Sequence, residues 1–262
     1  MVRETGWIAT IGGLAVMAVA LTCFGEDKKA ARKKILFFTQ SDEFRHSVVR
    51  RPLTGELSHA EKIFKKIATE AGYKVDLSQD FHDLQKGNLA DYAAIVTYTS
   101  GNPKIAKEAL MEWVRAGGAF MGIHASTDTF KNDPAYVKFI GAAFKTHAPG
   151  NKEVTIKIDD PNNPATKMLA GEWKIVDEIY HFKGFVRDNV HMLLSIDMDK
   201  TNLKQQKMEK GKFYPVAWTR TEGKGRVFYT SLGHREDVWT NPVYQKHLLG
   251  GLAWVLAGDK GK

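Results

Sequence analysis

Histidine side chains follow several short apolar runs in this sequence. His46 follows KILFFTQ, His124 follows GGAFMGI, and His234 follows RVFYTSLG. A histidine at the end of a buried strand is costly unless it has a polar partner. Two or three imidazoles with one carboxylate form an open zinc or iron site, and an imidazole alone can exchange protons near neutral pH. The sequence therefore raises two hypotheses, a metal centre and metal-free acid–base catalysis.

A carboxylate and a phenol lie together in the stretch VDEIYHF. Glu178 and Tyr180 are two residues apart, so they face the same side of an expected strand, and His181 points the other way. The spacings H-x-H and H-E-x-x-H do not occur, so spacing alone gives little support for a metal. Ser126 follows His124 by two residues but lacks the G-x-S-x-G setting, which disfavours a serine triad.

Other polar residues accompany these candidates. Asp128 lies in the segment after His124, Arg235 follows His234, and His147 lies in the loop-like stretch KTHAPGN. The remaining histidines lack polar neighbours at strand ends or begin an apolar strand, and we assign them to packing or the surface: His59, His82, His191 and His247.

The stretch GGAFMGIHAST predicts a strand that ends in a sharp turn. Such turns hold a side chain at the mouth of an α/β sheet, where the projecting residue of well-known enzymes is a nucleophilic cysteine or serine. In this chain His124 takes that place.

The elements that would position these side chains alternate along the first half of the chain. Apolar runs typical of buried parallel strands alternate with amphipathic helical patterns, which predicts a parallel sheet with helices on both faces. Polar groups then gather beyond the carboxyl ends of the strands. We expect strands at 34–40, 73–80, 91–100 and 119–125, and helices at 55–73, 102–118 and 241–259.

The second half of the chain has the alternation of half-exposed antiparallel strands. The expected strands are 151–160, 173–185 and 191–198, followed by a hairpin over 213–234 that turns at 222–225. We place the first of these near an edge of the sheet. No repeat and no long linker occurs, which favours one compact domain.

The N-terminus carries an apolar run, IATIGGLAVMAVALTCFG, followed directly by charged residues. We predict a secretory signal over residues 1–25, with a retained membrane anchor as the alternative, then a charged linker at 26–33 and a domain at 34–258. The protein would be periplasmic or secreted, with no stable membrane span after cleavage. Cys23 is the only cysteine, so the mature chain would have no disulfide, cysteine-bound zinc or thiol nucleophile.

Composition points to a folded protein without a nucleic-acid partner. The 262 residues carry a formal charge of +8, but lysine and arginine are scattered among acidic residues. No basic block is interleaved with aromatic residues, as a nucleic-acid surface would require.

Three motifs together resemble the ThuA-like (trehalose-utilisation) domain family. They are GGAFMGIHASTDTF, DEIYHF and PVAWTRTEGKGRVFYTSLGH, and the resemblance runs from Lys34 to Gly258. It implies an α/β fold of the flavodoxin-like, class I glutamine amidotransferase-like type, a three-layer sandwich with a mainly parallel sheet and added antiparallel edge strands.

The resemblance also bears on the chemistry. In glutamine amidotransferases the turn carries a catalytic cysteine; His124 takes its place here, so glutaminase chemistry through a thioester is excluded. ThuA-like proteins are associated with sugar catabolism through 3-keto intermediates. The resemblance therefore implies an exported enzyme, a lyase or hydrolase, that acts on 3-keto-disaccharides or 3-keto-glycosides by histidine- or metal-assisted acid–base chemistry.

We carry the following roles into the structure. The expected catalytic residues are His124, Glu178, Tyr180 and His234. The expected substrate-binding residues are His46, Asp128 and Arg235. A zinc, iron or manganese ion would bind His124, His147 and His234.

The alternative is a carbohydrate-binding or accessory module on an amidotransferase-like scaffold. It would bind a small-molecule sugar without turnover, and four tryptophans could offer stacking faces, although we expect at least two of them to pack in the core. These are Trp113, Trp173, Trp218 and Trp239. The oligomeric state stays open, a homo-oligomer included.

Overall fold

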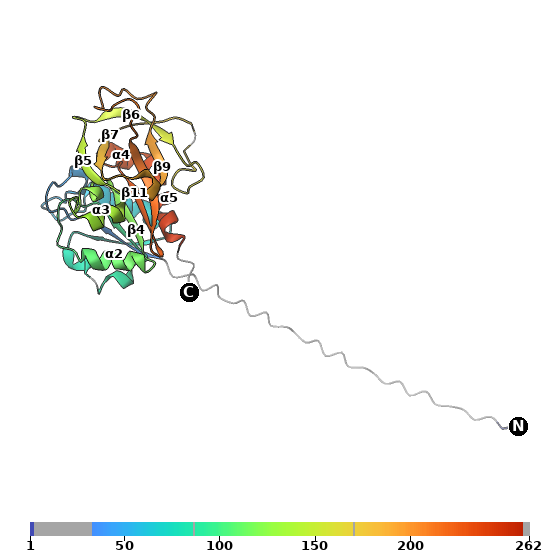
Figure 1. The fold of residues 1–262 in the computed structure, drawn as a ribbon. Coiled ribbons are helices and arrows are strands. Elements are labelled where there is room, and N and C mark those ends of the chain that lie inside the picture. The colour runs from blue at the N-terminus through green and yellow to red at the C-terminus, as the bar shows by residue number, and fades with distance from the viewer. Residues whose placement is uncertain (3–32, 86, 170, 259–262) are drawn as a thin grey trace. The chain divides into compact units, whose positions relative to one another are not determined.

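The computed structural model describes residues 1–2, 33–85, 87–169 and 171–258 (Figure 1). The chain divides into two units, Met1–Ala31 and Arg32–Lys262, and the features below belong to the second. The predicted signal at 1–25, with Cys23, and nearly all of the predicted linker lie outside the described residues.

A nine-stranded mixed sheet organises this unit. Its strand order is β2-β1-β3-β4-β11-β10-β9-β6-β7. The first five strands in that order are parallel, and the strands from β10 to β7 pair antiparallel with their neighbours. Strands β5 and β8 form a separate two-stranded sheet. This arrangement confirms the predicted fold class, including the antiparallel strands at one edge.

The strand bounds follow the apolar runs of the sequence. The strands of the large sheet are β1 Lys34–Phe38, β2 Lys74–Ser78, β3 Ala94–Thr97, β4 Ala119–Ile123, β6 Lys152–Ile158, β7 Trp173–Asp177, β9 His191–Ile196, β10 Pro215–Glu222 and β11 Gly225–Thr230. The small sheet holds β5 Ala143–His147 and β8 Tyr180–Lys183.

Helices cover both faces of the parallel strands. The α-helices are α1 His59–Glu70, α2 Lys107–Arg115, α3 Pro134–Ile140, α4 Glu236–Thr240 and α5 Pro242–Leu256. The 3-10 turns are η1 Ser47–Val49, η2 Phe81–Leu84, η3 Leu89–Asp91, η4 His124–Thr127 and η5 Arg187–Asn189. Side chains of α1 and α5 join one hydrophobic core, and those of α2 and α3 join the other.

Both cores draw on β1, β3, β4 and β11, whereas the side chains of β2 pack against only the core that contains α1 and α5. Ile35 and Phe37 of β1 enter one core, while Leu36 and Phe38 enter the other, because successive side chains point to opposite faces. A strand buried on both faces is apolar throughout, which explains the continuous apolar runs.

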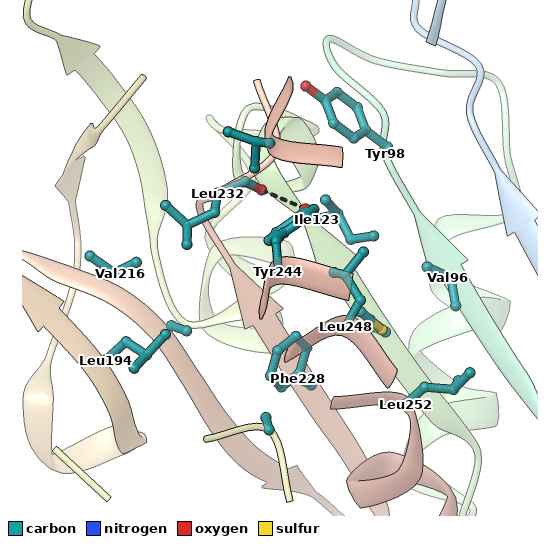
Figure 2. Close-up of a cluster of buried hydrophobic side chains, with 14 of the residues drawn as sticks. Val96, Tyr98, Ile123, Leu194, Val216, Phe228, Leu232, Tyr244, Leu248 and Leu252 are labelled. Carbon is teal, nitrogen blue, oxygen red and sulfur yellow. Dashed lines mark hydrogen bonds between the residues drawn. The ribbon is translucent and has the colours of Figure 1, made fainter. Parts of the chain in front are cut away.

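Helix α5 anchors the core beside the carboxyl ends of the central strands (Figure 2). Tyr244, Leu248 and Leu252 lie along one side of the helix and reach the strands near Phe228. The Tyr244 hydroxyl donates a 3.1 Å hydrogen bond to the carbonyl of Leu232, which ties the helix to the segment after β11.

The helix expected over 102–118 begins later than predicted. Its N-cap is Ala106 and its first residue is Lys107. Upstream, Gly101 forms a bridge with Thr129 and accepts a hydrogen bond from the amide of Phe130. These tertiary bonds hold the backbone at Gly101, just before the expected start of the helix, in a non-helical conformation.

The strand expected over 173–185 is two strands in two different sheets. Strand β7 ends at Asp177 and β8 begins at Tyr180. The Asp177 side chain accepts backbone hydrogen bonds from Glu178, Gly233 and Arg235, which breaks the strand and turns the chain. Neither α3 nor β5 was anticipated from the sequence, although Asp133 caps α3 as an ordinary N-cap residue would.

In the described part of the chain, no helix has both the length and the apolar character needed to cross a membrane.

Candidate functional site

Four polar side chains from distant parts of the chain meet at the carboxyl ends of the parallel strands. His46 lies in the loop after β1, and His124 is the first residue after β4. Glu178 follows β7, and His234 lies in the segment between β11 and α4. Because β1, β4 and β11 are parallel members of one sheet, their carboxyl ends open on the same edge.

His124 occupies a sharp turn with unusual backbone geometry. Its φ angle is +43°, in the left-handed region that non-glycine residues rarely adopt. The turn holds the imidazole fully buried, with 0% of its surface exposed. The structure thus places an imidazole where the nucleophile of a strand–turn–helix elbow would stand.

The three imidazoles face one another around the carboxylate. Ring centroids are 4.9 Å apart for His46 and His124, 5.2 Å for His46 and His234, and 5.3 Å for His124 and His234. One ligand atom from each of these histidines and one from Glu178 all lie within 4.8 Å of one another. We call these four residues the histidine–glutamate cluster.

One nitrogen of each histidine in the cluster is buried without a hydrogen bond to any described residue. Glu178 Oε2 lies 3.4 Å from His124 Nε2 and 3.3 Å from His234 Nδ1, yet neither nitrogen makes a hydrogen bond within the described part of the chain. The same is true of the buried His46 Nδ1. Each unsatisfied buried polar atom costs about 1–3 kcal/mol, so three in one place indicate a ligand that satisfies them.

The tautomer of His124 is fixed from outside the cluster. Its Nδ1 lies 2.6 Å from the carbonyl oxygen of Ser231 and donates to it. In the neutral ring Nε2 then carries the lone pair, and this nitrogen faces Glu178. A metal-binding histidine is commonly held in this way by a backbone carbonyl.

Burial and mutual contact set the charges of the cluster. Burial, and then the nearby His124 and His234, lower the pKa of His46 to about 2. Burial favours the neutral form of Glu178, but its contacts with His124 and His234 outweigh that and lower its pKa. Burial also opposes the charge on His234, whose contact with Glu178 nevertheless raises its pKa. At neutral pH the cluster therefore offers a neutral His46 and an ionised Glu178, the forms that bind a metal.

The set of ligands fits a divalent metal. Imidazole and carboxylate together suit zinc, iron and manganese. The four ligand atoms lie within 4.8 Å of one another, so each would have to move only slightly toward a common centre to give metal–ligand bonds near 2 Å. The cluster can hold a metal ion.

Asp177 holds the backbone on either side of His234. It was not among the expected site residues. Only 1% exposed, it accepts a 2.7 Å hydrogen bond from the amide of Gly233 and a 3.2 Å bond from the amide of Arg235. Burial raises the pKa of this carboxyl. Its signal in the sequence was an acidic residue at the end of an apolar strand, directly before Glu178.

Gly233 is required at its position by backbone and by space. Its φ is +113°, and a β-carbon would lie 2.4 Å from the hydroxyl oxygen of Tyr244. Its carbonyl accepts a hydrogen bond from the indole of Trp239 at 2.8 Å. Both the amide and the carbonyl of Gly233, the residue before His234, therefore make hydrogen bonds that fix its backbone.

Of the other expected residues, only His46 belongs to the cluster, and the rest lie around it. His147, expected as a metal ligand, lies outside the set of four ligand atoms, and its Nδ1 is 3.2 Å from Glu178 Oε1. His46, expected to bind substrate, lies inside it. Tyr180 is buried with its ring centroid 4.2 Å from that of His124, and burial raises its pKa well above the usual range.

Asp128 and Arg235 are both paired with neighbouring charges. Asp128 accepts a 2.8 Å hydrogen bond from Lys131. Arg235 forms two 2.8 Å bonds to the carboxylate of Asp237. A cleft of about 390 Å³ beside the cluster is lined by Ser47, Asn151, His234, Arg235, Glu236 and Asp237. Arg235 is therefore placed at a cleft that reaches the cluster.

Three of the four tryptophans proposed as stacking faces are buried. Trp218 and Trp239 have 0% of their surface exposed and Trp173 has 7%. Trp113 packs beside Gly118, where a β-carbon would collide with its ring. The histidines assigned to packing or the surface are all outside the histidine–glutamate cluster.

Comparison with protein families gives one match. The family model ThuA, described as trehalose utilisation, matches residues 34–255. No curated protein matches the sequence.

Solved structures share the fold. A ThuA-like protein from Bacteroides uniformis has a TM-score of 0.68 and 22% identity, and the match covers 93% of this chain and 95% of that one. A ThuA-like protein from Parabacteroides merdae has a TM-score of 0.68 and 19% identity, over 87% and 91% of the two chains. A cytoplasmic protein from Salmonella typhimurium has a TM-score of 0.58 and 12% identity, over 85% and 98%.

Proposed function

Because the chain belongs to the ThuA family, described as trehalose utilisation, we propose that it is a sugar-processing enzyme whose active site is the histidine–glutamate cluster. The observation that carries this proposal is the meeting of three imidazoles around one carboxylate: those of His46 and His124 are buried, that of His234 is half-buried, and each has one buried nitrogen without a hydrogen bond to a described residue. A purely structural histidine is normally hydrogen-bonded, whereas a site prepared for a metal keeps its lone pairs free until the metal binds.

The proposed cofactor is a zinc, iron or manganese ion held by His46, His124, Glu178 and His234. When bound, it would act as a Lewis acid that polarises a carbonyl oxygen of the substrate. The chain supplies the fixed tautomer of His124 and the ionised carboxylate of Glu178. Tyr180 packs on the His124 ring and keeps it in place.

The proposed substrate is a 3-keto-glycoside or 3-keto-disaccharide. The ketone at C3 acidifies the proton at C2, so a base can remove that proton. The electron pair of the C2–H bond then forms a C1=C2 double bond while the C1–O glycosidic bond breaks, and the departing oxygen takes up a proton. This elimination needs no second carboxylate, in contrast to ordinary glycosidases.

His147 is the residue best placed for the proton transfer. Its Nδ1 lies 2.8 Å from the carbonyl of Ala148 and donates to it, which leaves Nε2 to accept a proton. Its side chain is 39% exposed beside Glu178, whereas His124 is fully buried. An accessible base next to a buried ligand cluster suits a substrate that enters from the cleft at His234.

Elemental analysis and a turnover assay on the full chain test the proposal together. We expect near-stoichiometric metal in the wild type and its loss in Glu178→Gln and His46→Ala. We expect turnover of a 3-keto-glycoside but not of the parent glycoside. His82→Ala is the matched control, because His82 is exposed and contacts only Asp80 and Phe81 among the described side chains.

The carbohydrate-binding alternative gives a different result. A protein that binds the 3-keto sugar equally well in wild type and Glu178→Gln, forms no product and contains no metal would overturn the enzyme hypothesis. The burial of Trp173, Trp218 and Trp239 leaves Trp113 as the one partly exposed ring among the four proposed stacking faces.

Export is a separate part of the proposal and rests on the sequence alone. We propose that residues 1–25 direct the chain out of the cytoplasm and are removed. N-terminal sequencing of the protein from the periplasmic and cytoplasmic fractions of its host tests this. An intact N-terminus in the cytoplasm contradicts it.

A further inference from the structure

A second pocket lies on the opposite side of strand β8 from the histidine–glutamate cluster. Tyr180 of β8 packs on His124, and the next residue, His181, points to the other face because strand side chains alternate. His181 lines a pocket of about 330 Å³ whose walls come from β5, β8 and the segment before β10. Tyr180 also lines the pocket, but none of the four residues of the histidine–glutamate cluster does.

The pocket carries an excess of positive charge. Lys145 and Lys207 line it, and neither lies within ion-pair distance of an acidic side chain among the described residues. The third lysine of the wall, Lys212, is paired with Glu209 at 2.7 Å. Two cations on one concave surface attract an anionic group, since a concave site strengthens the local field.

One ring nitrogen in the wall of the pocket has no hydrogen-bond partner among the described residues. His181 Nε2 is buried and makes no hydrogen bond to any residue that the structure describes, and the centroid of the ring lies 5.1 Å from that of Tyr214. Burial lowers the pKa of His181, so the ring is neutral at neutral pH. A neutral imidazole nitrogen without a partner suits a ligand hydroxyl group.

Aromatic rings form the rest of the wall. Phe185 and Phe213 are stacked with centroids 6.2 Å apart and an interplanar angle of 26°. Phe213 is 36% exposed, and Arg187 lies 4.4 Å from its centroid. Such a surface packs against the flat side of a ring.

We propose that this pocket binds a hydroxylated ring that carries an anionic group, either an acidic sugar or a hydroxylated aromatic acid. Lys145 and Lys207 bind the anionic group, His181 Nε2 meets a hydroxyl, and Phe213 packs on the ring. The site is separate from the histidine–glutamate cluster, so it can be occupied whether or not the proposed reaction takes place.

Calorimetric titration of the full chain tests the proposal with defined probes. The probes are glucuronate, 4-hydroxybenzoate, benzoate, glucose and sodium sulfate. We expect glucuronate or 4-hydroxybenzoate to bind at least about tenfold more tightly than glucose and sulfate. The tighter of the two identifies the source of the ligand. If neither binds more tightly than glucose and sulfate, the proposal is wrong.

Variants assign the binding to this pocket. Lys145→Gln and Lys207→Gln should each weaken binding about fivefold or more, whereas Lys210→Gln should leave it unchanged. Lys210 is an exposed lysine of the same segment that does not line the pocket, so it controls for net charge. An equal loss in Lys210→Gln would show only general charge attraction and would overturn the site.

His181→Phe tests the hydroxyl contact. The wild type should prefer 4-hydroxybenzoate to benzoate, and the variant should lose that preference; an unchanged preference removes His181 from the site. Glu178→Gln should bind the probes as the wild type does, so a failed metal or turnover assay leaves this test intact.

Discussion

Asp177 Oδ2 accepts a 2.7 Å hydrogen bond from the backbone amide of Gly233, the residue before His234. Asp177 thereby links the end of β7, which supplies Glu178, to the segment after β11, which supplies His234. The two residues of the cluster that come from the second half of the chain are held together by this one buried carboxylate.

Asp177→Asn should therefore loosen the cluster without touching its ligands. The amide can accept through one oxygen only, so one of the backbone amides from Gly233 and Arg235 loses its acceptor. We expect metal affinity to fall by about 10- to 100-fold and stability by about 1–3 kcal/mol. Competition with a metal indicator dye measures the affinity. Unchanged affinity would show that the segment is held by other contacts.

The backbone at His124 should store measurable strain. A residue with a β-carbon at φ +43° is disfavoured by about 1–2 kcal/mol, and glycine avoids this. We expect His124→Gly to be more stable than His124→Ala by about 1 kcal/mol in urea denaturation, while both lose the metal. If His124→Ala is the more stable, the turn does not constrain the residue in solution.

Removal of the metal should lower the thermal stability of the protein only when the histidine–glutamate cluster is intact. A metal present at 100 times its Kd adds about 2.7 kcal/mol, which for a chain of this size raises Tm by about 5 to 10 °C. A chelator should abolish this increment in the wild type and change nothing in Glu178→Gln. His82→Ala should behave as the wild type. An equal effect of the chelator on Glu178→Gln would place the metal elsewhere.

Glu61 should make stability depend on acidic pH. Its carboxylate is buried at the start of α1, where it receives hydrogen bonds from Arg51 at 2.8 Å and from Thr39 at 2.7 Å. Burial opposes the charge, but these bonds and the backbone amide of Ser58 outweigh it and lower the pKa of Glu61 below its usual 4.5. A lowered folded pKa gives stability that is present above pH 4.5 and is lost as the pH falls through the folded value.

Glu61→Gln tests this dependence. The variant should be less stable than the wild type by about 1–3 kcal/mol at pH 7, and the difference should shrink as the pH falls below 4.5. Urea denaturation at pH 7 and pH 3.5 measures both values. A difference that stays constant over this range would contradict the role of the charge.

Much of the fold follows from local pattern. The apolar run at 34–38 and the helical spacing at 59–70 specify their elements because a doubly buried strand must be apolar and a covering helix must be amphipathic. The predicted hairpin turn lies between β10 and β11 as expected. The start of α2 could not be predicted, because the bonds that hold Gly101 come from Thr129 and Phe130, which lie about 30 residues away in the sequence.

The sequence by itself placed His124 at the end of a buried strand, and its motifs identified the family. Only the tertiary structure decided which side chains join it. Strands β4 and β11 are neighbours although about 100 residues separate them, which brings His234 to His124. The break after Asp177 turns Glu178 toward both histidines, and the loop after β1 brings His46 rather than His147 into the set of ligands. Local propensity contains no information on such contacts, because they arise from the order of strands in the sheet.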